Sequence, residues 1–135
     1  MSSLTSSDRQ AIAEFVTKLQ TLFASDLQSV ILYGSKARGD AGPDSDIDLL
    51  VILSDEAWTE RRQLSQVSSR VSLNHDVLLL PHVVSLVRWQ KMAEDPFSFY
   101  REVFKDGLPI YGDASFFAPL NHHDAAPLVP MLANA

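Results

Sequence analysis

The sequence contains no cysteine, no long apolar run and no cluster of basic residues. Without cysteine the chain can form neither disulfides nor thiolate metal sites, so we expect no redox chemistry and a reducing compartment. No apolar stretch approaches the roughly 18 residues that cross a membrane, and the first residues show no basic segment followed by a hydrophobic one. We therefore expect a cytoplasmic protein without a membrane partner.

Basic residues are outnumbered: 11 Lys and Arg face 17 Asp and Glu, for a formal net charge of -6. This balance argues against long nucleic acid as a partner, because a phosphate backbone binds clustered positive charge. Hydrophobic residues make up 46% of the 135 positions, as in an ordinary globular domain. We expect one domain over residues 1–120 and a flexible C-terminal tail over 121–135.

Apolar periodicity and turn residues predict alternating helices and strands. A capping box of Ser7 and Gln10 would start the first helix. The elements expected after it are a strand at 30–33, a turn or short helix at 36–45, a strand at 47–53, a helix at 54–70, a strand at 76–80 that Pro81 ends, a helix through Val84 to Met92, a helix that Pro96 starts and Gly107 stops, and a closing segment at 108–111.

The first strand ends in Gly34-Ser35, which indicates a phosphate-binding turn. Glycine lets a phosphate approach the backbone closely, and the following polar turn offers free N–H groups. Ser35 adds a hydroxyl donor. Lys36 and Arg38 could neutralise a polyphosphate, and the Arg38 guanidinium can hold two oxygens at once.

Asp46 and Asp48 begin the next strand and are two residues apart. The two-residue period of a strand places both carboxylates on one face, with their Cβ atoms roughly 7 Å apart. Such a pair can bind one magnesium ion or bracket two that are about 4 Å apart. The alternative to a metal site is a pair of solvated carboxylates that only form a turn.

A site that transfers a phosphoryl group between two metal ions usually uses a third carboxylate from a neighbouring strand. Asp76 precedes the apolar run Val77-Leu78-Leu79-Leu80, so we expect it to be this third ligand. It would hold the catalytic metal and orient or deprotonate the attacking hydroxyl. His75, next to it, would face the other way and pack against the protein.

These motifs together resemble the DNA polymerase beta-type nucleotidyltransferases, and most closely their minimal branch. The resemblance is carried by Gly34-Ser35-Lys36-Ala37-Arg38-Gly39, by Ser45-Asp46-Ile47-Asp48-Leu49, by Asp76, and by Phe99-Tyr100-Arg101-Glu102 with the segment from Gly107 to Tyr111. It spans about residues 8 to 112. It implies the polymerase beta-like nucleotidyltransferase fold, an α/β (α+β) fold with a small mixed sheet flanked by helices.

The resemblance also implies a reaction. A hydroxyl would attack the α-phosphorus of ATP, pyrophosphate would leave, and AMP would be transferred with the help of magnesium, expected as two ions. Asp46, Asp48 and Asp76 would hold the metal and carry catalysis, and Gly34, Ser35, Lys36 and Arg38 would bind the triphosphate. Many minimal members neutralise a partner HEPN-domain ribonuclease toxin by AMPylation of its tyrosine, so this chain resembles such antitoxins.

Two other functions stay open on the sequence. An antitoxin could mask its toxin by binding alone, a hypothesis that the acidic composition and the tail motivate. Alternatively, AMP could be transferred to a small-molecule hydroxyl. The chain lacks an additional substrate-binding domain of the kind expected for antibiotic-modifying relatives, which favours an acceptor presented by another protein.

Overall fold

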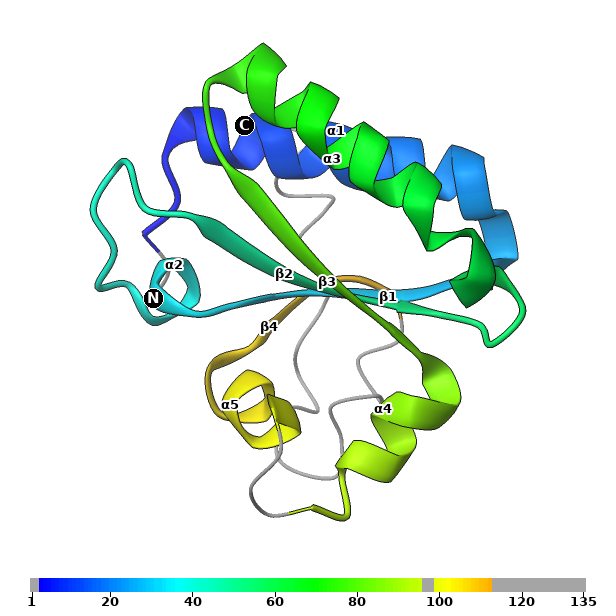
Figure 1. Ribbon diagram of the computed structural model, residues 1–135. Coiled ribbons are helices and arrows are strands. Elements are labelled where there is room, and N and C mark those ends of the chain that lie inside the picture. The colour runs from blue at the N-terminus through cyan, green and yellow to red at the C-terminus, as the bar shows by residue number, and fades with distance from the viewer. Residues whose placement is uncertain (1–2, 96–98, 113–135) are drawn as a thin grey trace.

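The computed structural model describes residues 3–95 and 99–112 (Figure 1). The elements in chain order are α1 (Ser6–Phe23), η1 (Ala24–Asp26), β1 (Leu27–Tyr33), α2 (Ser35–Arg38), β2 (Ile47–Leu53), η2 (Ala57–Glu60), α3 (Arg61–His75), β3 (Leu79–Ser85), α4 (Leu86–Met92), α5 (Phe99–Asp106) and β4 (Leu108–Gly112). No helix within these ranges is long and apolar enough to cross a membrane.

The strands form one mixed sheet in the order β3-β2-β1-β4. β1 pairs antiparallel with β2 and with β4, whereas β2 pairs parallel with β3. Helices α1 and α3 cover one face of this sheet, and α4 and α5 lie on the other (Figure 1). The mixed α/β class expected from the sequence is therefore confirmed.

Strand β2 is apolar without alternation because both of its faces are covered, as predicted. Ile47, Leu49 and Val51 pack into the core beneath α1 and α3. Leu50 and Ile52 face the smaller cluster under α4 and α5. Since side chains alternate along a strand, Asp48 shares the face of Leu50 and Ile52. The β2 residue that carries the chemistry thus lies on the α5 side of the sheet.

The N-cap of helix α1 lies two residues earlier than the sequence suggested. The capping box is formed by Thr5 and Asp8, not by Ser7 and Gln10. Thr5 Oγ1 accepts a hydrogen bond from the Asp8 N–H at 3.0 Å, and the Thr5 N–H donates to Asp8 Oδ2 at 2.9 Å. Asp8 also forms an ion pair with Lys36, so its carboxylate is held by two contacts.

The third strand is displaced from its predicted position. It runs from Leu79 to Ser85 and not over 76–80, so Pro81 lies within it and the next helix begins only at Leu86. β3 is an edge strand, where a proline can be accommodated because one side of the strand needs no ladder hydrogen bond. Asp76 is instead the C-cap of α3, in the left-handed region with φ 53°.

Two further boundaries refine the sequence expectations. Ser54 does cap a turn, because its Oγ accepts from the Ala57 N–H at 3.2 Å, but η2 intervenes and α3 begins only at Arg61. The predicted helix start at Pro96 and the predicted tail at 121–135 lie outside the described residues.

Candidate active site

The β1–α2 junction brings the two sequence motifs into contact. Gly34 has φ 79° and precedes the short helix α2 that starts at Ser35. Tyr33, the last residue of β1, is the cross-strand partner of Asp48 on β2. A Cβ at Gly34 would touch the Asp48 carboxylate, with its Cγ at 3.1 Å and Oδ2 nearer still. The glycine therefore makes room for the carboxylate itself.

Asp46 and Asp48 lie close enough to repel each other. Asp46 is exposed just before β2, and Asp48 is partly buried within the strand. Burial raises the pKa of Asp48, the negative charge of Asp46 raises it further, and Arg38 opposes both effects. A positive charge between the two aspartates would reduce this repulsion, so the pair is electrostatically suited to a cation.

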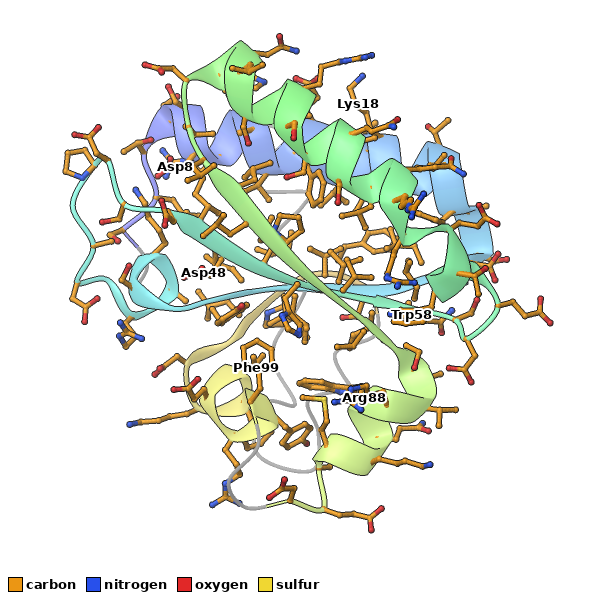
Figure 2. The ribbon with its side chains drawn as sticks, viewed as in Figure 1. Asp8, Lys18, Asp48, Trp58, Arg88 and Phe99 are labelled. Carbon is orange, nitrogen blue, oxygen red and sulfur yellow. The ribbon has the colours of Figure 1, made fainter. Side chains whose placement is uncertain are left out.

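Asp48 opens into a cavity of about 560 Å³, a size that suits a small-molecule ligand. Its walls come from β1, α2, β2 and α5. The lining residues are Tyr33, Gly34, Ser35, Arg38, Asp48, Glu102, Lys105 and Asp106. Figure 2 shows Asp48 beside α2, on the side of the sheet where Phe99 begins α5. The predicted phosphate turn and the second aspartate of the pair thus share one cavity.

Arg38 lines this cavity as well. Its side chain is 44% exposed, and its guanidinium reaches Asp40 at 3.1 Å and Asp106 at 3.5 Å. The hydrogen bond with Asp40 raises the pKa of Arg38 above its already high value. The contact with Asp106 joins α2 to α5 across the opening, so Arg38 connects the two walls.

Lys36 does not line the cavity, contrary to the sequence expectation. Its ammonium is fully buried on the opposite side of α2, where Nζ donates to Asp8 Oδ2 at 2.7 Å. It also reaches the carbonyl of Pro43 at 3.5 Å. A buried, paired ammonium cannot turn to a phosphate without leaving Asp8 unpaired, so Lys36 has a structural role. It ties the start of α1 and the loop before β2 to α2.

Asp76 does not line the cavity that Asp48 lines. It lines a separate hollow of about 280 Å³ with Asp8, Asp44, Ser45 and neighbouring residues. Within the described ranges, no group of three or more His, Cys, Asp and Glu side chains is placed to hold a metal ion. The strand that would have carried Asp76 to the site begins three residues later, at Leu79. His75 does turn to the protein, where Nε2 lies 2.6 Å from Glu14 Oε1.

Helix α5 contributes residues that the sequence reasoning did not assign. Glu102, Lys105 and Asp106 line the cavity together. Their spacing of three and four residues, which places side chains on one helix face, was the available signal. Tyr33 of β1 also lines this cavity. Burial, with the charges of Asp48 and Glu102, which line the same cavity, raises the pKa of Tyr33 to about 12.

The donor set fits magnesium bound together with a nucleotide. Magnesium is commonly held by one or two carboxylates, with the remaining positions filled by phosphate oxygens and water. Asp48 on β2 and Asp46 just before the strand supply two carboxylates. Gly34, Ser35 and Arg38 line the same cavity as Asp48.

Comparison with known sequences finds relatives over most of the chain. The sequence model of the family described as "Polymerase beta, Nucleotidyltransferase" matches residues 17–115. The chain is 36% identical over 73 residues to a Methanocaldococcus jannaschii protein provisionally named protein adenylyltransferase MJ0141, covering 53% of this chain and 74% of that protein. It is 29% identical over 104 residues to MJ0604 of the same organism, which has the same provisional name, covering 77% and 98%.

Comparison with solved structures finds the same fold. A provisionally named nucleotidyltransferase from Sulfolobus solfataricus matches with a TM-score of 0.53 and 19% identity, covering 89% of this chain and 99% of that chain. A chain in the crystal structure of a toxin–antitoxin with AMP-PNP matches with a TM-score of 0.45 and 18% identity, covering 90% and 84%.

Proposed function

Because this chain belongs to the polymerase beta family of nucleotidyltransferases, we propose that it transfers AMP from ATP to a hydroxyl group on a partner protein. The observation that carries the proposal is the meeting of Gly34 and Ser35 with Asp48 in one cavity, beside the exposed Asp46. Relatives provisionally named protein adenylyltransferases support a protein acceptor.

The partner we propose is a HEPN-domain ribonuclease toxin, modified on a tyrosine and thereby neutralised, so that this chain acts as its antitoxin. The resemblance to the minimal nucleotidyltransferases supports this assignment. A tyrosine on a folded partner also suits an open cavity that residues of both α2 and α5 line.

In this proposal several residues of the cavity, and Asp46 beside it, have separate roles in the reaction. Ser35, Arg38 and Lys105 bind the triphosphate, and Gly34 keeps the backbone close to Asp48. Asp48 in the cavity, with the exposed Asp46 beside it, would hold magnesium, which would supply neutralisation of charge on the phosphates. The acceptor oxygen forms a bond to the α-phosphorus while the bond from that phosphorus to the bridging oxygen breaks. Pyrophosphate leaves, and the acceptor proton passes to water. Lys36 and Asp76 have no part in this assignment.

Intact mass of the co-expressed HEPN partner tests the proposal. With the wild-type chain we expect the partner to gain the mass of one or more AMP groups, and with Asp46→Asn plus Asp48→Asn we expect no gain. A matched control, Asp44→Asn plus Glu94→Gln, removes the same charge from exposed positions outside the cavity and should leave labelling intact.

The other outcomes separate the remaining functions. Neutralisation without any mass gain would refute catalysis and establish that the chain masks its partner by binding. Formation of an AMP adduct on a small hydroxyl compound, with no partner present and no mass gain on the partner, would refute the protein acceptor.

A further inference from the structure

The face of β3 that neighbours the aspartate pair is apolar. In the parallel register Leu80 is the direct partner of Asp48, and the carbonyl of Leu78 accepts from the Ile47 N–H at 2.9 Å, beside Asp46. Paired residues of neighbouring strands point to the same side of a sheet. Leu78 is 50% exposed and also lines the smaller hollow that Asp76 lines, and Leu80 is 40% exposed. The position where a third carboxylate could stand beside Asp48 therefore presents aliphatic surface instead.

This apolar surface continues toward α5. His82 follows on the same face of β3, as the partner of Leu50. The His82 ring packs against the Phe99 ring with centroids 4.5 Å apart, and Phe99 in turn contacts Tyr33 edge-on at 5.2 Å. The Phe99 ring therefore links His82, on the same face of β3 as Leu80, to Tyr33, which lines the cavity.

The leucines lie on the side from which an acceptor must approach. The triphosphate-binding residues Ser35 and Arg38 follow β1, and in the sheet order β2 separates β1 from β3. In phosphoryl transfer the attacking and leaving oxygens lie roughly in line with the phosphorus between them. If pyrophosphate departs toward α2, the acceptor oxygen arrives over Asp48 from the β3 edge, which is the edge that Leu78 and Leu80 line.

We propose that Leu78 and Leu80 form the acceptor-side wall of the site and select a hydroxyl carried on an aromatic ring. This inference rests on the proposed function and assigns the selection of its tyrosine acceptor to two residues. A phenol has an apolar body and a polar tip, so its ring covers the leucines while its oxygen reaches the aspartate pair. The hydroxyl of serine or of a sugar brings no such ring and leaves the leucines in water.

The experiment uses the full chain, with its leucine methyl groups isotope-labelled, saturated with magnesium and a non-hydrolysable ATP analogue. The probe is N-acetyl-tyrosinamide and the comparator is N-acetyl-serinamide. Leu80→Ser removes the proposed contact. Leu73→Ser is the matched control, because Leu73 is 83% exposed on α3, the helix on the other face of the sheet.

We expect N-acetyl-tyrosinamide to shift the methyl resonances of Leu78 and Leu80 and to leave those of Leu73 in place. Leu80→Ser should weaken its apparent affinity about tenfold, whereas Leu73→Ser should not change it. In AMP transfer to the same probe, Leu80→Ser should raise KM with little change in kcat. Equal affinity in the two variants, absence of methyl shifts, or preference for N-acetyl-serinamide would overturn the inference.

Failure of the proposed function has a different signature. If no acceptor receives AMP from the wild-type chain but N-acetyl-tyrosinamide still shifts Leu78 and Leu80 selectively, catalysis is refuted and the acceptor wall stands. If AMP is transferred while Leu80→Ser behaves like Leu73→Ser, catalysis stands and the wall is refuted.

Discussion

The Asp48 carboxylate occupies the space that a side chain at Gly34 would need. A Cβ at Gly34 would lie 3.1 Å from Asp48 Cγ and closer to Oδ2, and the φ of 79° disfavours any other residue. The glycine in the Gly-Ser motif therefore allows β2 to bring its aspartate against the turn, and in the proposed function it also leaves the backbone open to a phosphate.

We predict that Gly34→Ala abolishes AMP transfer by displacing the Asp48 carboxylate. Positive φ alone should cost about 1–2 kcal/mol of unfolding free energy, and the collision adds to it. Urea denaturation and labelled-ATP transfer measure the two effects. Gly42→Ala is the control, because a Cβ there would have Ser45 Oγ at 4.0 Å as its near neighbour. A Gly34→Ala chain with normal transfer would refute the role assigned to this contact.

Lys36→Met should destabilise the fold by about 3–5 kcal/mol, because it leaves the Asp8 carboxylate buried without its cation. Asp8→Leu combined with Lys36→Met should recover much of this loss, since no charge is then left unpaired. Chemical denaturation of the two single variants and the double variant measures the coupling. Additive losses would contradict the structural role of the pair.

Lys105→Met should leave stability nearly unchanged and weaken ATP binding about tenfold, because Lys105 lines the cavity that Lys36 does not reach. Fluorescence titration with a labelled ATP analogue tests this prediction. Lys91→Met is a suitable control, since Lys91 on α4 lines a different hollow. If Lys36→Met weakened ATP binding at unchanged stability and Lys105→Met did not, the structural role assigned to Lys36 would be wrong.

The features predicted well from the sequence are those that local pattern determines. The strand at 47–53 and the adjacent Gly34-Ser35 turn follow from apolar runs and turn residues, and the structure has both. The misassigned residues depend on distant partners. Lys36 is buried because Asp8, 28 positions away, receives its ammonium. Nothing in the local sequence around Lys36 distinguishes that outcome from a solvent-facing cation.

The prediction that Asp76 begins the third strand was wrong for a related reason. The apolar run after it is continuous, so periodicity cannot tell where pairing with β2 starts. Pro81 suggested an end to the strand, but β3 lies at the sheet edge, where proline is permitted. The residues of α5 were missed because their position against β1 and α2 is a matter of tertiary packing. Only the i, i+3, i+4 spacing of Glu102, Lys105 and Asp106 hinted at a shared face.

Asp48→Asn should stabilise the metal-free chain while abolishing transfer. Burial and the charge of Asp46 raise the pKa of Asp48, so its ionised form weakens the fold above the unfolded-state pKa. Removing the charge should raise the unfolding free energy at neutral pH, by roughly 0.5 kcal/mol after solvent screening. Thermal unfolding without magnesium measures the gain. Added magnesium and ATP should stabilise the wild type and not the variant; the same stabilisation in both would remove Asp48 from the metal site.

His82 should make the fold less stable as the pH falls below about 6.5. Burial lowers the pKa of His82 from 6.5, and the positive charge of Arg88 lowers it further. The unfolded chain therefore binds a proton at a higher pH than the folded chain, and stability is lost as acid protonates the unfolded state first. Protonation would also place a charge in the ring contact with Phe99.

His82→Gln removes this titration, so the decline in unfolding free energy between about pH 7.5 and about pH 5.5 should be shallower than in the wild type. Arg88→Gln is the informative companion, because it removes the lesser cause of the shift and keeps burial. It should leave most of the pH dependence in place. Urea denaturation at several pH values gives the slopes. A His82→Gln slope equal to that of the wild type would mean that other groups carry the acid sensitivity, and that the His82–Phe99 contact tolerates the charged ring.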